Sequence, residues 1–261
     1  MKQIGYFISA VAMSLILTGV AVAQKAPDGL SIIQKVYNRD QPKDQEGKLT
    51  MTLTNSRGEK RVREIRQFIK DDGTVEKKIM FFTAPADVRN TSFMNWSYNK
   101  GDKEDNQWIY LPALKKTKRI SSEGKSDYFM GSDFTYDDLG DRLPEQDVHT
   151  LVREESLNGA ACYVVKSVPK DKNYMYSSTV TWVDKEKWIG LKKEFYDEGG
   201  AHLKTLTVVK NSQIGKYWVI SASEMHNLKK NHRTSMELKD LSVDKGISDG
   251  QFTERTMMRG L

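Results

Sequence analysis

Apolar and polar residues alternate along most of this chain. The run from Leu49 to Thr54 alternates without interruption, which is typical of an antiparallel strand with one buried face. Similar runs recur between short turns, and they predict about a dozen strands in sequential order. The expected strands are 49–54, 62–69, 77–82, 91–98, 108–111, 161–165, 174–183, 188–196, 202–209, 217–225 and 233–241. One antiparallel sheet with so many strands is expected to curl.

Helical periodicity is confined to the two ends of the expected mature chain. Residues 30–39 place their apolar side chains on one helical face, and Asp28 is a candidate N-cap. The tail, residues 248–261, predicts a short helix or an extended cap. Because so little helix is available, the inner face of a curled sheet would stay partly unfilled unless a loop or a ligand occupies it.

Large apolar side chains are abundant enough to line such a hollow. The chain holds five Trp, eleven Met and nine Phe, and Met adapts its shape to variable partners. The pattern therefore predicts an apolar cavity that binds lipid or acyl chains. Its expected lining is Leu49, Met51, Leu53, Met94, Trp96, Tyr98, Trp108, Tyr110, Phe129, Met130, Phe134 and Trp182. A wholly buried chain of about sixteen carbons would gain roughly 12 kcal/mol.

The central stretch, residues 107–142, interrupts the alternation with a loop between charged runs. We expect it to form one wall and the lip of the cavity, with residues 121–133 as a lid that hinges at Gly124 and Gly131. A static surface loop is the alternative. A basic strip precedes the loop and consists of Lys115, Lys116, Lys118 and Arg119. At the rim of the cavity this strip would meet an anionic headgroup, an acidic partner or a membrane; a solvated face is the alternative.

The first residues have the form of a secretory signal. Lys2 precedes a mostly apolar run at 4–22, and residues 21–23 form a small-x-small cleavage site. We expect export to the periplasm, a signal peptide at 1–23 and one domain at 24–261, with a retained membrane anchor as the alternative. Removal of Lys2 lowers the formal net charge of +6 by one. A modestly basic exported protein suits an anionic membrane surface or headgroup, and the compartment argues against nucleic acid.

Cys162 is the single cysteine of the chain. No intramolecular disulfide is therefore expected, and the fold must be held together by burial of apolar surface. The thiol lies in a strand-like run, where a buried free Cys behaves as a small hydrophobic group.

Several segments resemble a known family, in the same order along the chain. They are FFTAPADVRNTSFMNW at 81–96, WIYLPALKKTKRI at 108–120, FMGSDFTYDDL at 129–139, YVVKSVPK at 163–170, WVDKEKWIGLKKEFYD at 182–197 and FTERTMMRGL at 252–261. Together they resemble the LolA-like periplasmic outer-membrane lipoprotein-sorting proteins. Two positions depart from the pattern, with Asn90 in place of Gly and Met94 in place of Leu; the second change is nearly volume-neutral.

The resemblance implies an antiparallel sheet wrapped as a half-open β-barrel, with a few helices or loops as a lid. It also implies a periplasmic carrier that moves lipid or lipoprotein acyl chains towards the outer membrane without catalysing a reaction. The implied partners are an inner-membrane lipid exporter and an outer-membrane acceptor, with transient membrane contact, and we expect a monomer. The cargo stays open between lipoprotein, phospholipid, glycolipid and other hydrophobic molecules.

Motifs for catalysis, metals and cofactors do not stand out in the sequence. Residues 131–133 do not form a nucleophile elbow, and the four histidines lack zinc-site spacing. The acidic group Asp133, Asp137, Asp138 and Asp141 lacks the spacing of a calcium loop, although a weak calcium site stays an alternative to a helix start. We therefore expect no enzyme and no cofactor. An envelope sensor or scaffold that binds a protein through the same half-barrel is the second hypothesis, and a lipid hydrolase is the third.

Overall fold

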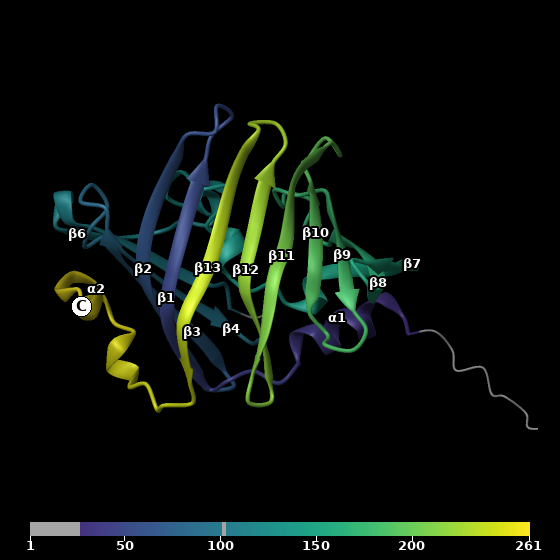
Figure 1. The fold of residues 1–261 in the computed structure, drawn as a ribbon, viewed down its shortest axis with the longest axis horizontal. Coiled ribbons are helices and arrows are strands. Elements are labelled where there is room, and N and C mark those ends of the chain that lie inside the picture. The colour runs from purple at the N-terminus through teal and green to yellow at the C-terminus, as the bar shows by residue number, and fades with distance from the viewer. Residues whose placement is uncertain (1–26, 101–102) are drawn as a thin grey trace, which may run out of the picture.

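The computed structural model describes residues 27–100 and 103–261. Within these ranges, thirteen strands form one antiparallel sheet that curls strongly (Figure 1). The strands are β1 (Asp44–Thr54), β2 (Lys60–Asp71), β3 (Val75–Ala84), β4 (Ser92–Tyr98), β5 (Asn106–Leu111), β6 (Lys116–Arg119), β7 (Asp147–Leu157), β8 (Ala160–Pro169), β9 (Ser178–Asp184), β10 (Gly190–Tyr196), β11 (His202–Ile214), β12 (Tyr217–Asn227) and β13 (His232–Val243). The helices are α1 (Gly29–Tyr37) and α2 (Glu254–Arg259). The expected signal peptide and its cleavage site lie outside the described residues.

The strand order is β6-β5-β4-β3-β2-β1-β13-β12-β11-β10-β9-β8-β7. Consecutive strands pair as expected, with one exception. β6 does not pair with β7; instead the first strand, β1, pairs with the last, β13. β6 and β7 are therefore the two edges of the sheet, and the sheet is not closed between them. The prediction of a mainly β fold with a curled, incompletely closed sheet is confirmed.

The chain between the two edge strands runs across the concave side of the sheet (Figure 1). We call residues 120–146 the crossing segment and the concave side the inner face. The segment contains only short 3-10 turns, namely η2 (Glu123–Ser126), η3 (Phe129–Gly131), η4 (Asp137–Leu139) and η5 (Pro144–Gln146). Its apolar residues Phe129, Phe134 and Leu139 are buried against the inner face. This segment is therefore the main filling of the curled sheet.

The two termini of the described fold cover different faces. α1 begins at its N-cap Asp28, whose carboxylate accepts from the Ser31 N–H at 2.8 Å, and its residue Ile32 packs on Val165 and Val183. Antiparallel partners point to the same face, so the ladder from Val165 through Thr181 and Lys193 to Leu206 places this helix on the inner face.

The C-terminal tail covers the outer face of β3 and β4. The tail forms η6 (Asp249–Gln251) and α2, and it buries Phe252 and Met257 against Ile79, Phe81 and Met94. The Ser92 hydroxyl donates to the Met257 carbonyl at 3.0 Å. Of the two forms predicted for the tail, a short helix or an extended cap, the structure shows the short helix.

The strand expected at 174–183 begins later than the alternation suggested. β9 begins at Ser178, so Tyr174 and Tyr176 precede the ladder and do not share the face of Trp182, as an uninterrupted strand would require. Tyr176 packs in the inner cluster, whereas Trp182 packs with Cys162 and Val164 on the outer face. The period of two applies only where a residue is held in a ladder, which explains the error.

Asn90, which stands where the family pattern has Gly, has a φ of 65°. This is the left-handed region, where Asn is tolerated better than most residues with a side chain. Cys162 is buried, as expected. In the part of the chain that the structure describes, no helix combines the length and apolar character needed to cross a membrane.

Candidate functional site

The inner face carries a cluster of buried apolar side chains around Phe129. This ring is fully buried and lies 5.1 Å from the ring of Phe93, 6.0 Å from that of Phe82 and 5.5 Å from that of Tyr136, measured between centroids. β1 supplies Leu49, Met51 and Leu53 to the same cluster. The space under the crossing segment is thus filled by the protein's own side chains.

Buried charges fasten the crossing segment to the sheet. Lys204 on β11 is fully buried, and its ammonium group donates to the Asp138 carboxylate and to the Asp133 carbonyl, the latter at 3.0 Å. The Tyr176 hydroxyl donates to Asp138 at 3.0 Å. A buried ion is stable only when it is paired and hydrogen-bonded, so these contacts specify where the segment lies.

A second polar contact fixes the same segment to β13. The Asp133 carboxylate accepts from the Thr234 hydroxyl at 2.7 Å and lies 2.7 Å from Nδ1 of His232. The Asp133 N–H in turn donates to the Thr234 hydroxyl at 2.9 Å. The acidic run of the central stretch therefore acts as a set of anchors. Among the residues the structure describes, no group of three or more His, Cys, Asp or Glu is arranged to hold a metal ion.

A small cavity of about 220 Å³ remains beside these anchors. Phe134, Phe195 and Met225 line it together with Lys193 and Asp137. Burial raises the pKa of the Asp137 carboxyl and lowers the pKa of the Lys193 ammonium group. Ligand pockets for small molecules usually span about 300–1,000 Å³, so this cavity is too small to hold an acyl chain as it stands.

Beyond the segment, part of the inner face stays open. Leu206, Met236 and Leu238 on β11 and β13 pack against the inner cluster but are only partly buried. These side chains share a face with Met51 and Leu49, as the register of β1 with β13 shows. An apolar strip formed by these three side chains therefore continues on the inner face beyond the part that the segment covers.

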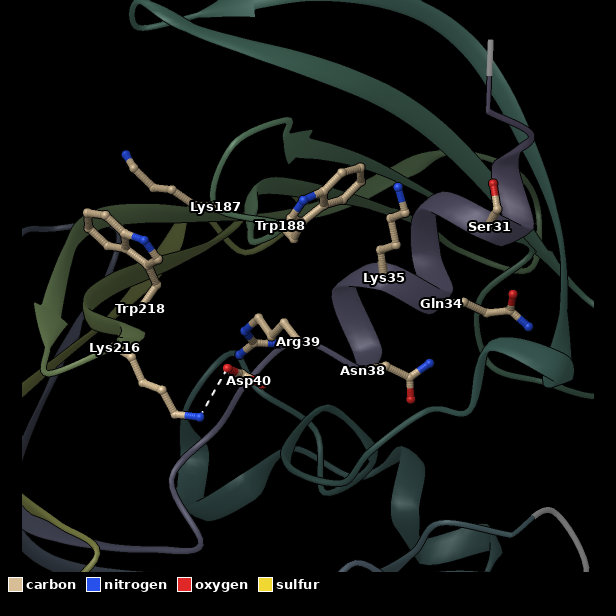
Figure 2. Close-up of a pocket in the computed structure, with 10 residues that line it drawn as sticks. All are labelled: Ser31, Gln34, Lys35, Asn38, Arg39, Asp40, Lys187, Trp188, Lys216 and Trp218. Atoms are coloured by element: carbon tan, nitrogen blue, oxygen red, sulfur yellow. Dashed lines mark ion pairs between the residues drawn. The ribbon is translucent and has the colours of Figure 1, made fainter. Parts of the chain in front are cut away.

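A larger pocket opens where α1 meets the sheet (Figure 2). It has a volume of about 520 Å³ and lies between α1, the turn from β9 to β10 and the hairpin from β11 to β12. We call it the mouth pocket. Its lining residues are Ser31, Gln34, Lys35, Asn38, Arg39, Asp40, Lys187, Trp188, Lys216 and Trp218.

Two tryptophans and four cations dominate the mouth pocket. The Lys35 ammonium group lies 4.4 Å from the Trp188 ring centroid, and that of Lys187 lies 4.9 Å from the Trp218 ring centroid. Such cation–π contacts orient the ammonium groups over the aromatic faces. Asp40 is the one carboxylate in the lining, and it pairs with Lys216 at 3.2 Å. The pocket is therefore both aromatic and net positive.

Trp188 has an unusual backbone conformation, with a φ of 53°. A bulky residue in the left-handed region is strained by about 1–3 kcal/mol. The turn is held by Asp184, whose carbonyl accepts from the Trp188 N–H at 3.0 Å and whose carboxylate accepts from the N–H groups of Glu186 and Lys187 at 2.8 and 2.9 Å. The turn thus directs a large indole into the pocket.

The twelve residues expected to line the cavity divide into separate groups. Six of them, Leu49, Met51, Leu53, Phe129, Met130 and Phe134, meet in the inner cluster. Four others pack on the outer face under the C-terminal tail and are Met94, Trp96, Trp108 and Tyr110. Tyr98 lies at the end of β4, where its hydroxyl accepts from the Asn106 amide at 3.0 Å, and Trp182 lies on the outer face near β8. The assignment of Met94, Trp96, Trp108 and Tyr110 to the inner face is wrong. Both faces of β4 and β5 are covered, so the alternation did not show which face is the inner one.

The basic strip lies at the β6 edge of the sheet. Lys115 precedes the strand with a φ of 48°, and Lys116, Lys118 and Arg119 are exposed on it. Lys118 pairs with Ile109 and Arg119 with Trp108, so their side chains point to opposite faces. Lysines on an exposed edge discourage pairing with other strands, which gives the strip a structural role apart from any partner.

The sequence interpretation missed the mouth pocket and the buried Lys204. Lys35 lies on α1, whereas Arg39 follows the last helical residue, Tyr37, by two positions. The helix expected at 30–39 would have placed both side chains on one side, because they are four positions apart, and this spacing was the only sequence signal for the pocket. Trp188 and Trp218 are distant in sequence, and only the neighbouring turns of the sheet bring them to one site.

A curled antiparallel sheet, open between its edges and covered on its inner face by a long crossing segment, defines the LolA-like class of fold. A family model described only as "uncharacterized protein" matches residues 74–259. A crystal structure of an outer membrane lipoprotein-sorting protein domain from Vibrio parahaemolyticus is 37% identical, with a TM-score of 0.83 over 88% of this chain and 98% of that one. The chain belongs to this family of LolA-like outer-membrane lipoprotein-sorting proteins.

Two further structures share the fold. A DUF1329 family protein from Desulfovibrio piger is 27% identical, with a TM-score of 0.83 over 88% of this chain and 97% of that one. A LolA superfamily protein from Nitrosomonas europaea is 18% identical, with a TM-score of 0.67 over 88% of this chain and 99% of that one, which supports the fold alone. None of the three names denotes an enzyme. A search of curated protein sequences finds no match.

Proposed function

We propose that the chain, as one mature domain of residues 24–261, is a periplasmic carrier of lipid or lipoprotein acyl chains. The observation that carries this proposal is the 37% identity to a lipoprotein-sorting domain over 98% of that domain's length. The geometry supports it as well, because the apolar inner face is covered by a segment that belongs to no strand. The carrier binds its cargo on the inner face and moves it towards the outer membrane.

Cargo would displace the crossing segment instead of entering an empty void. Phe129 and Phe134 occupy the part of the inner face that an acyl chain would cover. Each buried methylene contributes about 0.8 kcal/mol, so a long chain can replace the contacts of these two rings. The open strip at Leu206, Met236 and Leu238 offers a first contact before the segment moves.

The proposed acyl contacts are therefore the residues of the inner cluster. They are Leu49, Met51 and Leu53 on β1, with Phe129, Met130 and Phe134 as the side chains that give way. The carrier works without catalysis or cofactor, as a monomer in transient contact with membranes. An inner-membrane lipid exporter would load it and an outer-membrane acceptor would unload it.

Native mass spectrometry of the protein released gently from its own periplasm tests the proposal. We expect a fraction of the protein to carry a bound lipid or acylated species, and the delipidated protein to bind a fluorescent fatty acid. Protein that carries no such mass and does not bind the probe contradicts the proposal.

A charged side chain on the open strip provides a matched test. Leu238→Glu places a carboxylate on the inner face and should weaken fatty-acid binding at least about tenfold, since a buried carboxylate is strongly disfavoured. Lys239→Glu, at the next position of β13 and exposed, should leave binding unchanged. Equal binding by both variants would place the lipid elsewhere.

The alternative is an envelope sensor or scaffold that binds a protein through the same half-barrel. The observation that favours it is the filled inner cluster around Phe129. In that case the protein would be purified free of lipid but together with a membrane partner.

A further inference from the structure

The mouth pocket contains more positive charge than its own residues neutralise. Lys216 pairs with Asp40 at 3.2 Å, and Lys187 lies 3.6 Å from the Asp184 carboxylate behind the turn. Lys35 and Arg39 have no carboxylate within ion-pair distance among the described residues. Asp141 and Glu76 act on Arg39 only from beyond that distance, so both cations of the lining are available to an anion.

Arg39 carries an unsatisfied donor in addition to its charge. Its Nη1 donates to the Val36 carbonyl at 2.9 Å. Its Nε is buried and has no acceptor in the part of the chain that the structure describes. A buried donor without a partner is costly, and an anionic oxygen that enters the pocket with a small shift of the guanidinium group would satisfy it.

The aromatic part of the pocket indicates what the anion is attached to. Trp188 lines the pocket, stacks on Tyr163 at 6.0 Å between ring centroids, and packs against the buried cluster of Ile32, Val165 and Val183. The pocket floor is thus continuous with apolar side chains under α1. Trp prefers positions where one side is apolar and the other is polar, which is the environment of a lipid glycerol backbone beneath its headgroup.

The volume and position of the pocket fit the same class of ligand. About 520 Å³ falls within the range of small-molecule sites. The pocket lies next to α1, which packs on the inner face of the sheet. A phosphate group binds most strongly where several Lys and Arg side chains converge.

We infer that the mouth pocket binds the net-anionic phosphodiester headgroup of an amphiphile, held by Lys35 and Arg39 and contacted by Trp188 and Trp218. This inference rests on the proposed carrier function and extends it to the chemical class of the cargo. The headgroup stays at the mouth while the acyl chains lie along the inner face. The pocket, rather than the basic strip on β6, then selects anionic lipid.

Two short-chain lipids with the same acyl groups test this assignment. Dihexanoyl phosphatidylglycerol and dihexanoyl phosphatidylcholine are titrated into the delipidated protein, with calorimetry and tryptophan fluorescence as readouts. We expect phosphatidylglycerol to bind at least about tenfold more tightly than phosphatidylcholine, because its net negative charge strengthens the hydrogen bonds of the site. In the Trp188→Phe variant, a large part of the fluorescence change should be lost.

Matched charge reversals locate the site. Lys35→Glu with Lys216→Glu should remove the preference for phosphatidylglycerol over phosphatidylcholine, since both side chains are exposed and line the pocket. Lys116→Glu with Lys118→Glu makes the same change of charge on β6 and should keep the preference. Circular dichroism of all variants excludes loss of the fold as the cause.

The outcomes separate this inference from the carrier function. If both lipids bind equally, or if only the β6 variant loses the preference, the headgroup assignment is overturned while lipid binding stands. If neither lipid binds to the wild type, the carrier function fails, and the assignment fails with it. If glycerol 1-phosphate alone binds as tightly as phosphatidylglycerol, the pocket is a site for free organophosphates and the lipid assignment is overturned.

Discussion

Under the crossing segment, the cation Lys204 is paired and enclosed, while at the mouth pocket the cations Lys35 and Lys216 are exposed. Lys204 is fully buried and contacts Asp138, whereas Lys35 is exposed over an aromatic ring. Removal of an ion from water requires a partner of opposite charge, and Lys204 already has one in Asp138. Lys35 has no such ion pair and can take an anionic ligand. The two regions therefore suit different parts of one amphiphile.

The largest difference between the regions should appear when an aromatic ring is removed from the segment. Phe129→Ala should lower the free energy of unfolding by about 4 kcal/mol, because a fully buried ring leaves a cavity. Lys35→Ala in the mouth pocket should change it by less than about 0.5 kcal/mol. Urea unfolding of both variants measures this. Similar losses at the two positions would show that the segment is not an integral part of the folded core.

The buried ion pair gives the next largest effect. Lys204→Met should lower the free energy of unfolding by about 3 kcal/mol, because Asp138 is left as a buried charge without its cation. The double variant Lys204→Met with Asp138→Leu should recover at least half of the loss, since no unpaired ion remains. Urea unfolding of the two single variants and the double variant completes this thermodynamic cycle. A double variant that is as unstable as the sum of the two single variants would contradict the pairing.

A smaller effect concerns Asp141, at the end of the segment that leads to β7. Burial, followed by repulsion from Glu76, raises the pKa of Asp141 from 3.8 to about 7, although the Lys78 ammonium group opposes the shift. Between about pH 4 and pH 7, the Asp141 carboxyl is therefore protonated in the folded state and ionised in the unfolded state. The free energy of unfolding falls as the pH rises through this window. Above about pH 7 this carboxyl is ionised in both states, and its contribution to the pH dependence of stability ends.

Asp141→Asn should remove this part of the pH dependence. From pH 5 to pH 8, we expect the stability of the variant to rise relative to wild type by roughly 2 kcal/mol, since a shift of one pKa unit corresponds to about 1.4 kcal/mol. The lost attraction between Lys78 and the ionised Asp141 offsets part of this gain. Thermal unfolding at a series of pH values measures it. Parallel curves for the two proteins would show that Asp141 titrates normally in the fold.

Much of the fold could be predicted from local pattern. The uninterrupted alternation of Leu49, Met51 and Leu53 places these residues on one face of β1, and the structure confirms that they are buried together. Asp28 acts as the N-cap of α1. These features depend on backbone periodicity and on hydrogen bonds between near neighbours, which sequence spacing expresses directly.

The site could be predicted only in part. Phe129 and Phe134 were recognised as apolar groups of the central stretch, and they do meet β1. Met94 and Trp108 were assigned to the inner face but lie under the tail. On strands that are covered on both sides, large apolar side chains occur on both faces. Alternation then no longer indicates which side chains point to the inner face.

The sequence by itself determined that this chain forms a curled antiparallel sheet with a helix at each end and a charged central segment. It could not determine that β1 pairs with β13, which makes β6 and β7 the edges and sends the central segment across the inner face. Nor could it bring Trp188 and Trp218 to one pocket beside α1. Strand order and pocket geometry depend on contacts between residues far apart in the chain, and the free energy of those contacts exists only once the sheet has formed.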